Sequence, residues 1–390
     1  MKKILAILIV IFMGFGLSGC NNITYKVYTI SMANHFGTIS SVQILYVEGT
    51  LDDEAKSTLD AGCNDVLKRL DDIFNIQDSS RTEKTELMLI NEKSGVEPVV
   101  VSPEVIEVLK EAISVSNDSK VDGVALYDPT IGVVWNAWNF IDNGFDYWED
   151  LLEPGSSNND PLSQEEIDKL LPLVGLDKVV INEEASTVYL SEAGMVLDLG
   201  SVVKGYAADK VKEYLLSQDI ERAVIDIGGN IQLLGMYIDD DNNDANWTIG
   251  IKTPFYYKYS QEQYTIGSIK TGEATVVTSG TYEKYIKDDE GNMYHHILDP
   301  RTGQPINNGV LCVTVVTTRS VVADSMSTML FSLGLERGME YVEAHEDIEA
   351  IYVVSDGTTN KIYASSGLES EFIFNVELTK INYSYEGALK

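Results

Sequence analysis

The stretch that most constrains this chain is Val196–Gly205, with the sequence VLDLGSVVKG, together with the segment that follows it. Val196–Leu199 is an apolar run that contains one acid, which predicts a short buried strand, and Gly200 and Ser201 then interrupt it. Apolar residues at helical spacing predict a helix over Tyr206–Ser217. Because backbone N–H groups are unpaired where a helix starts, a strand, a glycine turn and a helix start together form an anion pocket.

Three side chains of this stretch, Asp198, Ser201 and Lys204, are spaced to line such a pocket. In that interpretation Lys204 or the helix start holds a phosphate group. The alternative is a buried aspartate with its hydrogen bonds satisfied and a lysine exposed to solvent. These residues alone leave both interpretations open.

The chain is strongly acidic, with a formal net charge of −33 over 390 residues. Nucleic acid as a partner is excluded in practice, because binding phosphate backbones requires an excess of Lys and Arg. The charge is compatible with a body held off an anionic membrane and with binding of divalent cations. A hydrophobic content of 44% is ordinary for a globular protein.

The N-terminus has the pattern of a bacterial lipoprotein signal peptide over residues 1–19. Lys2 and Lys3 precede an apolar run that is too short for a comfortable membrane span, and small residues then lead to Cys20. We expect Cys20 to be the lipid-modified first residue of the mature protein, anchored extracytoplasmically to the cell membrane. The alternative is an ordinary signal peptide cleaved nearby. Residues 20–34 are expected as a tether, and residues 35–390 as one catalytic domain.

Helices and strands alternate along the rest of the chain. Helical periodicity and capping residues predict helices over Asp52–Phe74, Ser102–Ser116 and Ser163–Leu171. Between them lie short runs typical of mixed, mostly antiparallel strands, so we expect an α+β fold with one large mixed sheet and flanking helices. Cys63 and Cys312 fall in apolar patterns and are expected as buried side chains rather than a disulfide or catalytic thiols.

Three further segments carry similar chemistry: LYDPT at 126–130, TSGTYEKYIKDDEGNMYHHILDPRTGQP at 278–305, and ADSMST at 323–328. Together with VLDLGSVVKGYAAD at 196–209, they resemble in order and spacing the FAD:protein FMN transferase (ApbE) family. The resemblance extends from about residue 37 to about residue 342. It implies an ApbE-like flavin transferase fold and an enzyme that transfers FMN from FAD to a threonine hydroxyl of an acceptor protein, releasing AMP.

The resemblance also implies residues that contact FAD. Those positions are Phe36, Leu126, Tyr127, Asp128 and Leu298, and Asp198 is expected to orient the cofactor. For Phe36 the alternative is a plain core residue. The aromatic residues Trp135 and Trp138 are expected in the core of a helix.

Asp324, Ser327 and Thr328 share one face of an expected helix over Asp324–Leu335. A carboxylate and two hydroxyls are hard oxygen ligands, which suit Mg²⁺ better than zinc. Asp and Ser are also common helix caps, and on the residues alone the cap is the favoured interpretation. The resemblance reverses this preference, because the metal ligands of the family lie at these positions, with one more at Ser201.

His296 is the expected general base. A histidine beside an Asp-Pro turn is placed for proton transfer, since its ordinary pKa lies near neutrality. His295 and His296 are adjacent, and neighbours on a strand face opposite sides, so only one of them is expected to reach the site.

Two other functions stay open from the sequence. The site can hydrolyse FAD to FMN and AMP as an FAD pyrophosphatase, or the chain can be a flavin-binding lipoprotein without turnover. The resemblance implies as partner an acceptor flavoprotein of an extracytoplasmic electron-transport system.

Overall fold

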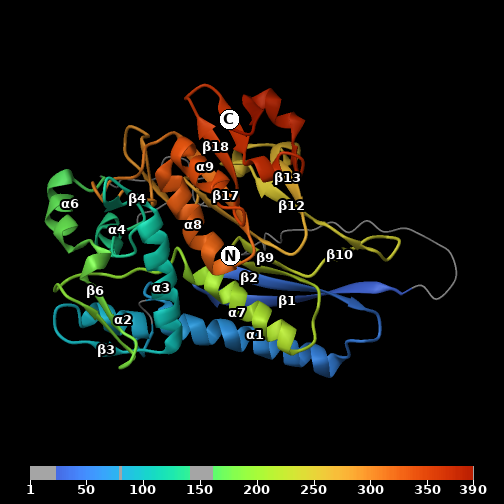
Figure 1. The fold of residues 1–390 in the computed structure, drawn as a ribbon, viewed down its shortest axis with the longest axis horizontal. Helices are drawn as coiled ribbons and strands as arrows, with labels where there is room; N and C mark the ends of the chain where they lie inside the picture. The colour runs from blue at the N-terminus through green and yellow to red at the C-terminus, as the bar shows by residue number, and fades with distance from the viewer. Residues whose placement is uncertain (1–22, 79–80, 141–160, 390) are drawn as a thin grey trace.

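The computed structural model describes residues 23–78, 81–140 and 161–389, and a nine-stranded mixed sheet dominates it (Figure 1). Neighbouring strands are antiparallel throughout, except for the parallel pair β19–β21 at one edge. The strands, in their order across the sheet, are β1 (Tyr25–His35), β2 (Thr38–Val47), β8 (Ala223–Ile227), β9 (Asn230–Leu234), β14 (Thr275–Gly280), β17 (Val310–Thr317), β18 (Glu349–Ser355), β19 (Asn360–Ala364) and β21 (Tyr383–Gly387).

Smaller sheets and hairpins surround this sheet. One three-stranded sheet joins β12 (Trp247–Lys252), β13 (Thr265–Thr271) and β20 (Phe372–Phe374), and another joins β3 (Val99–Val100), β7 (Thr187–Leu190) and β6 (Val179–Asn182). The two-stranded pairs are β4 (Lys120–Val121) with β5 (Val124–Ala125), β10 (Tyr237–Ile238) with β11 (Asp244–Ala245), and β15 (Tyr285–Lys287) with β16 (Met293–His295).

The helices of the described residues lie mostly beside the large sheet. They are α1 (Asp53–Phe74), α2 (Glu86–Glu92), α3 (Pro103–Asp118), α4 (Gly132–Trp138), α6 (Gln164–Leu170), α7 (Val203–Ser217), α8 (Ser320–Leu333) and α9 (Leu335–Glu343). Short 3₁₀ helices lie at Leu171–Leu173, Leu176–Lys178, Tyr256–Lys258, Gln261–Gln263, Ser366–Leu368 and Val376–Ile381. Among the described residues, no helix is long and apolar enough to cross a membrane.

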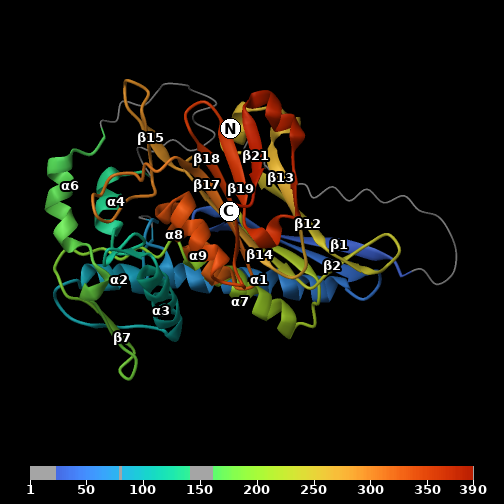
Figure 2. The same ribbon diagram turned by 45° about the horizontal axis from the view of Figure 1, so that its top comes forward.

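The central strands are buried on both faces. In β17, Val313 and Val315 belong to the core under the helices, whereas Cys312 and Val316 face the second core under the β12–β13–β20 sheet. Figures 1 and 2 show the resulting layers, with α1, α7, α8 and α9 along one face of the large sheet. The expected α+β class with a large mixed sheet is confirmed. Cys63 and Cys312 are free and buried, as expected.

Several expected elements form where capping and periodicity place them. The Asp52 carboxylate caps α1 by accepting the Ala55 N–H at 2.8 Å, and the buried stripe of α1 includes Leu59, Cys63 and Leu67. A full capping box, with Ser163 and Glu166 as partners, starts α6. Strong local signals of this kind define an element without help from the rest of the fold.

Other expected boundaries are corrected by tertiary contacts. The expected tether 20–34 is too long, because β1 starts at Tyr25 and pairs with β2 along its length. Val196–Leu199 is extended but makes only an isolated bridge from Val196, so it is no strand of a sheet. The helices begin earlier than expected, α7 at Val203 and α8 at Ser320. The expected signal peptide and Cys20 lie outside the described residues.

The helices α7 and α8 cap each other. Neither has a capping side chain of its own. The Asp324 carboxylate of α8 accepts the Gly205 N–H at the start of α7 at 2.9 Å. In return, the Asp209 carboxylate of α7 accepts the N–H groups of Ser320 and Val321 at 3.0 and 2.9 Å. Each helix start, with its unpaired donors and positive dipole end, thus receives an acid from the other helix.

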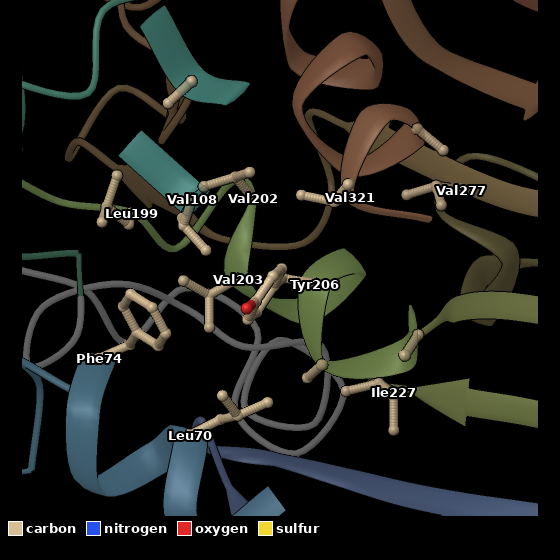
Figure 3. Close-up of a cluster of buried hydrophobic side chains, with 14 of the residues drawn as sticks. Leu70, Phe74, Val108, Leu199, Val202, Val203, Tyr206, Ile227, Val277 and Val321 are labelled. Carbon is tan, nitrogen blue, oxygen red and sulfur yellow. The ribbon is translucent and has the colours of Figure 1, made fainter. Parts of the chain in front are cut away.

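Glycine allows this close crossing. A Cβ atom on Gly205 would lie 2.1 Å from the Ser320 carbonyl oxygen, so a larger residue would force the helices apart. Buried apolar side chains pack around the crossing, and Figure 3 shows Val203, Tyr206 and Val321 among them. Gly205 therefore has a packing role, because it lets α7 and α8 approach closely.

Replacing Gly205 by Ala should destabilise the protein by about 1–3 kcal/mol, because the added methyl group overpacks the α7–α8 crossing. The gain in helix propensity, about 1 kcal/mol, is too small to offset the clash fully. Urea unfolding of both proteins measures the difference. The control is Leu216→Ala on the same helix, where the side chain is 50% exposed and little should change. Equal stability of the Gly205→Ala variant and the parent would contradict the packing argument.

Candidate active site

A cavity of about 370 Å³ lies where the segments singled out in the sequence come together. The walls come from the β1–β2 turn, the end of α1, the loop before α4, the start of α7, β14, the loop after β16, and α8. The predicted site residues that line it are Phe36, Leu126, Tyr127, Asp128, Asp198, Ser201, Lys204, His296, Leu298, Asp324 and Thr328. Two regions far apart in the sequence, around 201 and 324–328, thus face one space.

Ser327 is the exception among the predicted residues. Its side chain is fully buried behind the cavity wall and does not line the cavity. The hydroxyl donates to the Asp324 carbonyl at 2.8 Å and lies 2.7 Å from the Ser279 hydroxyl. Thr328, one residue later, does line the cavity, and its hydroxyl lies 3.3 Å from that of Ser279. The structure therefore supports Thr328 more than Ser327 as an oxygen ligand.

The loop that carries Leu126, Tyr127 and Asp128 is held from below by buried hydrogen bonds. The Ser119 hydroxyl accepts the N–H groups of Leu126 and Tyr127, each at 3.1 Å. The Asp128 carboxylate accepts from the backbone and hydroxyl of Thr130 and from the Leu176 N–H. Its oxygens are thus occupied by the loop itself, so Asp128 shapes the cavity wall more than it offers a free charge.

The Asp198 segment lies beside that loop. The Asp198 N–H donates to the Pro129 carbonyl at 2.9 Å, and the Asn91 side-chain amide brackets the Leu197 backbone with two bonds of 2.8 and 3.0 Å. One Asp198 oxygen accepts the Gly200 N–H at 2.8 Å. Burial raises the pKa of Asp198, and the nearby Lys284 ammonium partly opposes this. This aspartate faces the cavity with one turn-forming oxygen and one further oxygen.

Asp324 and Lys204 form the charged end of the cavity. Burial raises the pKa of Asp324, and the Lys204 ammonium and the Gly205 N–H oppose that rise. Burial would lower the pKa of Lys204, but Asp324, Glu283 and Asp226 outweigh it and raise this pKa. Asp324 is inside α8 and caps α7, so the expectation that it sits at its own helix start is wrong.

The oxygen donors at this end fit a hard divalent cation. Asp324 supplies a carboxylate, Thr328 and Ser201 supply hydroxyls, and the Tyr127 hydroxyl lies 3.0 Å from that of Ser201. Within the described residues no cluster of three His, Cys, Asp or Glu side chains is arranged to hold a metal ion. A site with one carboxylate, hydroxyls and room for substrate phosphates is typical of Mg²⁺, not of zinc.

His296 reaches the cavity with one ring nitrogen free. Its Nδ1 lies 3.0 Å from the Lys284 carbonyl oxygen, which only accepts hydrogen bonds, so Nδ1 carries the proton. The lone pair is therefore on Nε2. Burial, with Lys284 and His295 as further causes, lowers the pKa of His296 to about 3, so the ring is neutral at physiological pH. A neutral imidazole with a free Nε2 can accept a proton.

His295 does not line the cavity. This agrees with the expectation that only one of the two adjacent histidines reaches it. Its Nε2 lies 2.8 Å from the Ile306 carbonyl, and its Nδ1 accepts the Ile297 N–H at 3.3 Å. The ring packs edge-on against Phe331. Its role is to fasten the loop that carries His296 and Leu298.

The comparisons with known proteins agree with this geometry. The family model described as ApbE family matches residues 36–352. This chain belongs to the ApbE family. A relative from Klebsiella pneumoniae, named FAD:protein FMN transferase, is 36% identical over 293 residues, which cover 75% of this chain and 80% of the relative. A relative of the same name from Vibrio cholerae is 30% identical over 353 residues, covering 90% of this chain and 95% of the relative.

Solved ApbE structures share the fold. The structure titled flavin transferase ApbE from Vibrio cholerae matches with a TM-score of 0.70 and 28% identity, covering 90% of this chain and 100% of that one. The ApbE protein from Thermotoga maritima matches with a TM-score of 0.68 and 27% identity, covering 88% and 98%. The expected family, fold and class of enzyme are thus confirmed.

In this ApbE-family chain, Phe36 is held in a strained conformation at the cavity. Its φ angle is +54°, which is unusual for a bulky residue. The Phe36 N–H donates to the Asp71 carboxylate at 2.7 Å. Asp71 is buried, also binds Asn75 at 3.0 Å, and forms an ion pair with Arg81. Its contacts hold the aromatic ring of Phe36 in the cavity wall.

The sequence patterns missed some residues of the ApbE cavity. Trp135 is only partly buried: it packs against the core cluster around Trp138 but also lines the cavity. Trp138 is buried, as expected, and stacks on Phe140. Phe74, Glu283 and Lys284 line it too. Phe74 ends an ordinary amphipathic helix, and no motif spacing marks the others. Glu283 and Lys284 do lie within the segment 278–305, shortly after Gly280 at the end of β14, and this position was the one signal that could have been followed.

The low pKa of His296 predicts a pH dependence of the stability of the protein. Between the ordinary value of 6.5 and about 3 for His296, the unfolded chain binds a proton that the folded protein does not. The contribution of the buried His296 ring to the free energy of unfolding is therefore fully present above pH 6.5. It is lost as the pH falls toward 3, because the unfolded chain then gains a proton that the folded protein does not bind.

We therefore expect the free energy of unfolding of the parent protein to fall between pH 6.5 and 4, and the fall to be shallower in a His296→Gln variant. Urea titrations at each pH measure both slopes. The exposed His345→Gln variant is the matched control and should keep the parental slope. Identical slopes for parent and His296→Gln would show that His296 is not buried as a neutral ring.

Proposed function

We propose that this protein transfers FMN from FAD to a threonine hydroxyl of an acceptor protein, in a Mg²⁺-dependent reaction that releases AMP. The observation that carries the proposal is the shared cavity, where the free Nε2 of His296, the Lys204 ammonium and the oxygens of Asp324, Thr328 and Ser201 face one space. The name of the Klebsiella and Vibrio relatives, FAD:protein FMN transferase, supports flavin transfer to a protein. The threonine acceptor comes from the resemblance of the sequence motifs alone, and the Mg²⁺ comes from that resemblance together with the oxygen donors of the cavity.

The chemical step is a displacement at phosphorus. The acceptor hydroxyl oxygen forms a bond to the phosphorus on the FMN side of the diphosphate, and the bond from that phosphorus to the bridging oxygen breaks. AMP leaves with the electron pair of the broken bond. The proton of the acceptor hydroxyl passes to Nε2 of His296, which the Lys284 carbonyl holds in the required tautomer.

The residues that would hold Mg²⁺ are Asp324, Thr328 and Ser201. Bound there, the ion would neutralise negative charge on the diphosphate oxygens. The protein contributes the rest through its own groups: Lys204 brings a positive charge to the same end of the cavity, and the start of α7 brings its dipole.

The flavin and adenine rings need flat apolar walls with a few polar groups. Phe36, Phe74, Tyr127 and Trp135 supply aromatic surface around the cavity. Asp198 lines the same cavity near the Lys284 ammonium and would orient the bound dinucleotide through hydrogen bonds.

The experiment that tests the function incubates the purified protein with FAD, Mg²⁺ and a candidate acceptor, and measures both AMP release and the mass of the acceptor. We expect a mass increase equal to one FMN group and AMP in equal amount. AMP with FMN but no modified acceptor would favour the pyrophosphatase instead. Binding of FAD without any AMP would favour a flavin-binding protein without turnover.

Asp324→Asn should lower transfer by about 100-fold or more, because it removes the charge that faces the cavity. The amide oxygen can still accept the Gly205 N–H, so the α7 cap and the fold should persist. AMP release as a function of Mg²⁺ concentration measures the effect, and circular dichroism checks the fold.

The matched control is Asp209→Asn, the reciprocal cap on the other helix, which does not line the cavity. This variant should be less stable but keep the parental dependence on Mg²⁺. Unchanged transfer by Asp324→Asn, or loss of Mg²⁺ dependence in Asp209→Asn, would rule out the assignment of Asp324.

We also propose that the enzyme acts outside the cytoplasm, anchored to the membrane by lipid on Cys20, on an acceptor flavoprotein of membrane electron transport. The support is the basic and apolar start of the chain before Cys20. Cys20→Ala should move the full-length protein from the membrane fraction to the soluble fraction of cells and abolish labelling with a radioactive fatty acid. A membrane-bound Cys20→Ala protein would contradict this anchor; a Cys63→Ala variant, which alters a buried cysteine, is the control.

A further inference from the structure

Two lysines face the cavity without an ion-pair partner. Lys204 and Lys284 both line it, and neither makes a salt bridge with another residue in the described part of the chain. Most other lysines there are paired, for example Lys210 with Glu213 and Lys212 with Glu273. In a protein with a net charge of −33, unpaired lysines inside a cavity are a specific feature rather than a general surplus of positive charge.

Lys284 is held in place from two sides. Its ammonium lies 5.5 Å from the centre of the Trp135 ring, a cation–π contact on the cavity wall. Its backbone carbonyl accepts both the backbone N–H of His296 at 3.1 Å and the Nδ1–H of that ring at 3.0 Å. One residue therefore fixes the tautomer of the base and presents a positive charge to the same space.

The two ammonium groups repel each other. Burial is the main cause of a lowered pKa of Lys284, and the Lys204 ammonium is the next cause, while Asp198 and Glu283 act in the opposite direction. The neighbouring carboxylates offset part of this repulsion, but none of them forms an ion pair with either lysine among the described residues, so both ammonium groups can bind an anion that enters the cavity. A diphosphate carries negative charge on the oxygens of each of its two phosphate groups. It can therefore bind both ammonium groups, one at each phosphate.

We propose that Lys284 is a second phosphate-binding and catalytic residue, which with Lys204 holds the diphosphate of the dinucleotide substrate. This role rests on the proposed function. As the bond from phosphorus to the bridging oxygen breaks, the electron pair moves to the phosphate of the departing AMP, and the Lys284 ammonium stabilises that charge. Lysine suits this task because its ammonium is a compact charge with donors that can rotate toward either phosphate.

The link to His296 gives the arrangement a further consequence. Because the Lys284 carbonyl positions the base, the distance between the phosphate site and Nε2 is set within one short segment of chain. A diphosphate bound by the Lys284 ammonium is therefore placed at a fixed position relative to the proton acceptor. This favours Lys284 over an exposed lysine as a partner of the reacting group.

The test compares binding of FAD with binding of riboflavin, which has the same ring system but no phosphate, by fluorescence titration without acceptor. The Lys284→Met variant removes the charge and keeps a similar stem and the backbone carbonyl. We expect its affinity for FAD to fall about tenfold to hundredfold, as for loss of a charge-assisted hydrogen bond, while riboflavin binding changes less than about twofold. Lys284→Arg should recover part of the FAD affinity.

The control is Lys270→Met, which removes an exposed lysine on β13 that does not line the cavity and should leave both affinities unchanged. At saturating FAD, turnover of Lys284→Met should fall further, since the leaving phosphate gains charge in the transition state. Thermal melts of all variants check that each is folded.

Equal affinity of Lys284→Met and parent for FAD, or an equal loss for FAD and riboflavin, would overturn the role of Lys284. A parent protein that binds FAD and releases AMP while Lys284→Met behaves normally leaves the proposed function standing and refutes only this residue. A parent protein that fails to bind FAD refutes the proposed function, and the role of Lys284 with it.

Discussion

The reciprocal capping of α7 and α8 is the interaction on which the site depends. An acid from each helix accepts N–H groups at the start of the other, Asp324 from Gly205 and Asp209 from Ser320 and Val321. The crossing is close enough that Gly205 tolerates no side chain. Because α7 starts where the Ser201 turn ends and α8 carries Asp324 and Thr328, this contact brings the two sequence motifs to one cavity.

The same carboxylate therefore caps a helix and faces the cavity, whereas the two interpretations of the sequence treated a cap and a ligand as exclusive. Asp324 caps a helix, but the helix is α7 and not its own, and it still lines the cavity beside Lys204. A cap on a neighbouring helix uses one oxygen and leaves the charge facing the substrate. The positive end of the α7 dipole and the Lys204 ammonium therefore lie at the same end of the cavity as the Asp324 carboxylate.

Local signals identified the elements and most of the site, whereas contacts between distant segments decided the rest. The motifs around 126, 198, 296 and 324 were predicted to meet because together they resemble one family in order and spacing, and all of them line the cavity. The starts of α7 and α8 were misplaced because each is capped by a residue more than a hundred positions away, which no periodicity reveals. Lys284 and Trp135 were missed for the same reason, because they contact each other across a long stretch of sequence through a cation–π interaction.

The charges that line the cavity explain how a bound metal ion would help a diphosphate substrate to bind. Four carboxyl groups line it, Asp128, Asp198, Glu283 and Asp324, against the two lysines, and His296 is neutral. A diphosphate adds negative charge to a space that already has more acids than bases, so the lysines alone do not balance it. A divalent cation on the oxygens near Asp324 would reverse that imbalance at the end of the cavity where we propose that the phosphates bind. The lysines then position the diphosphate, and the neutral histidine can take a proton without first losing one.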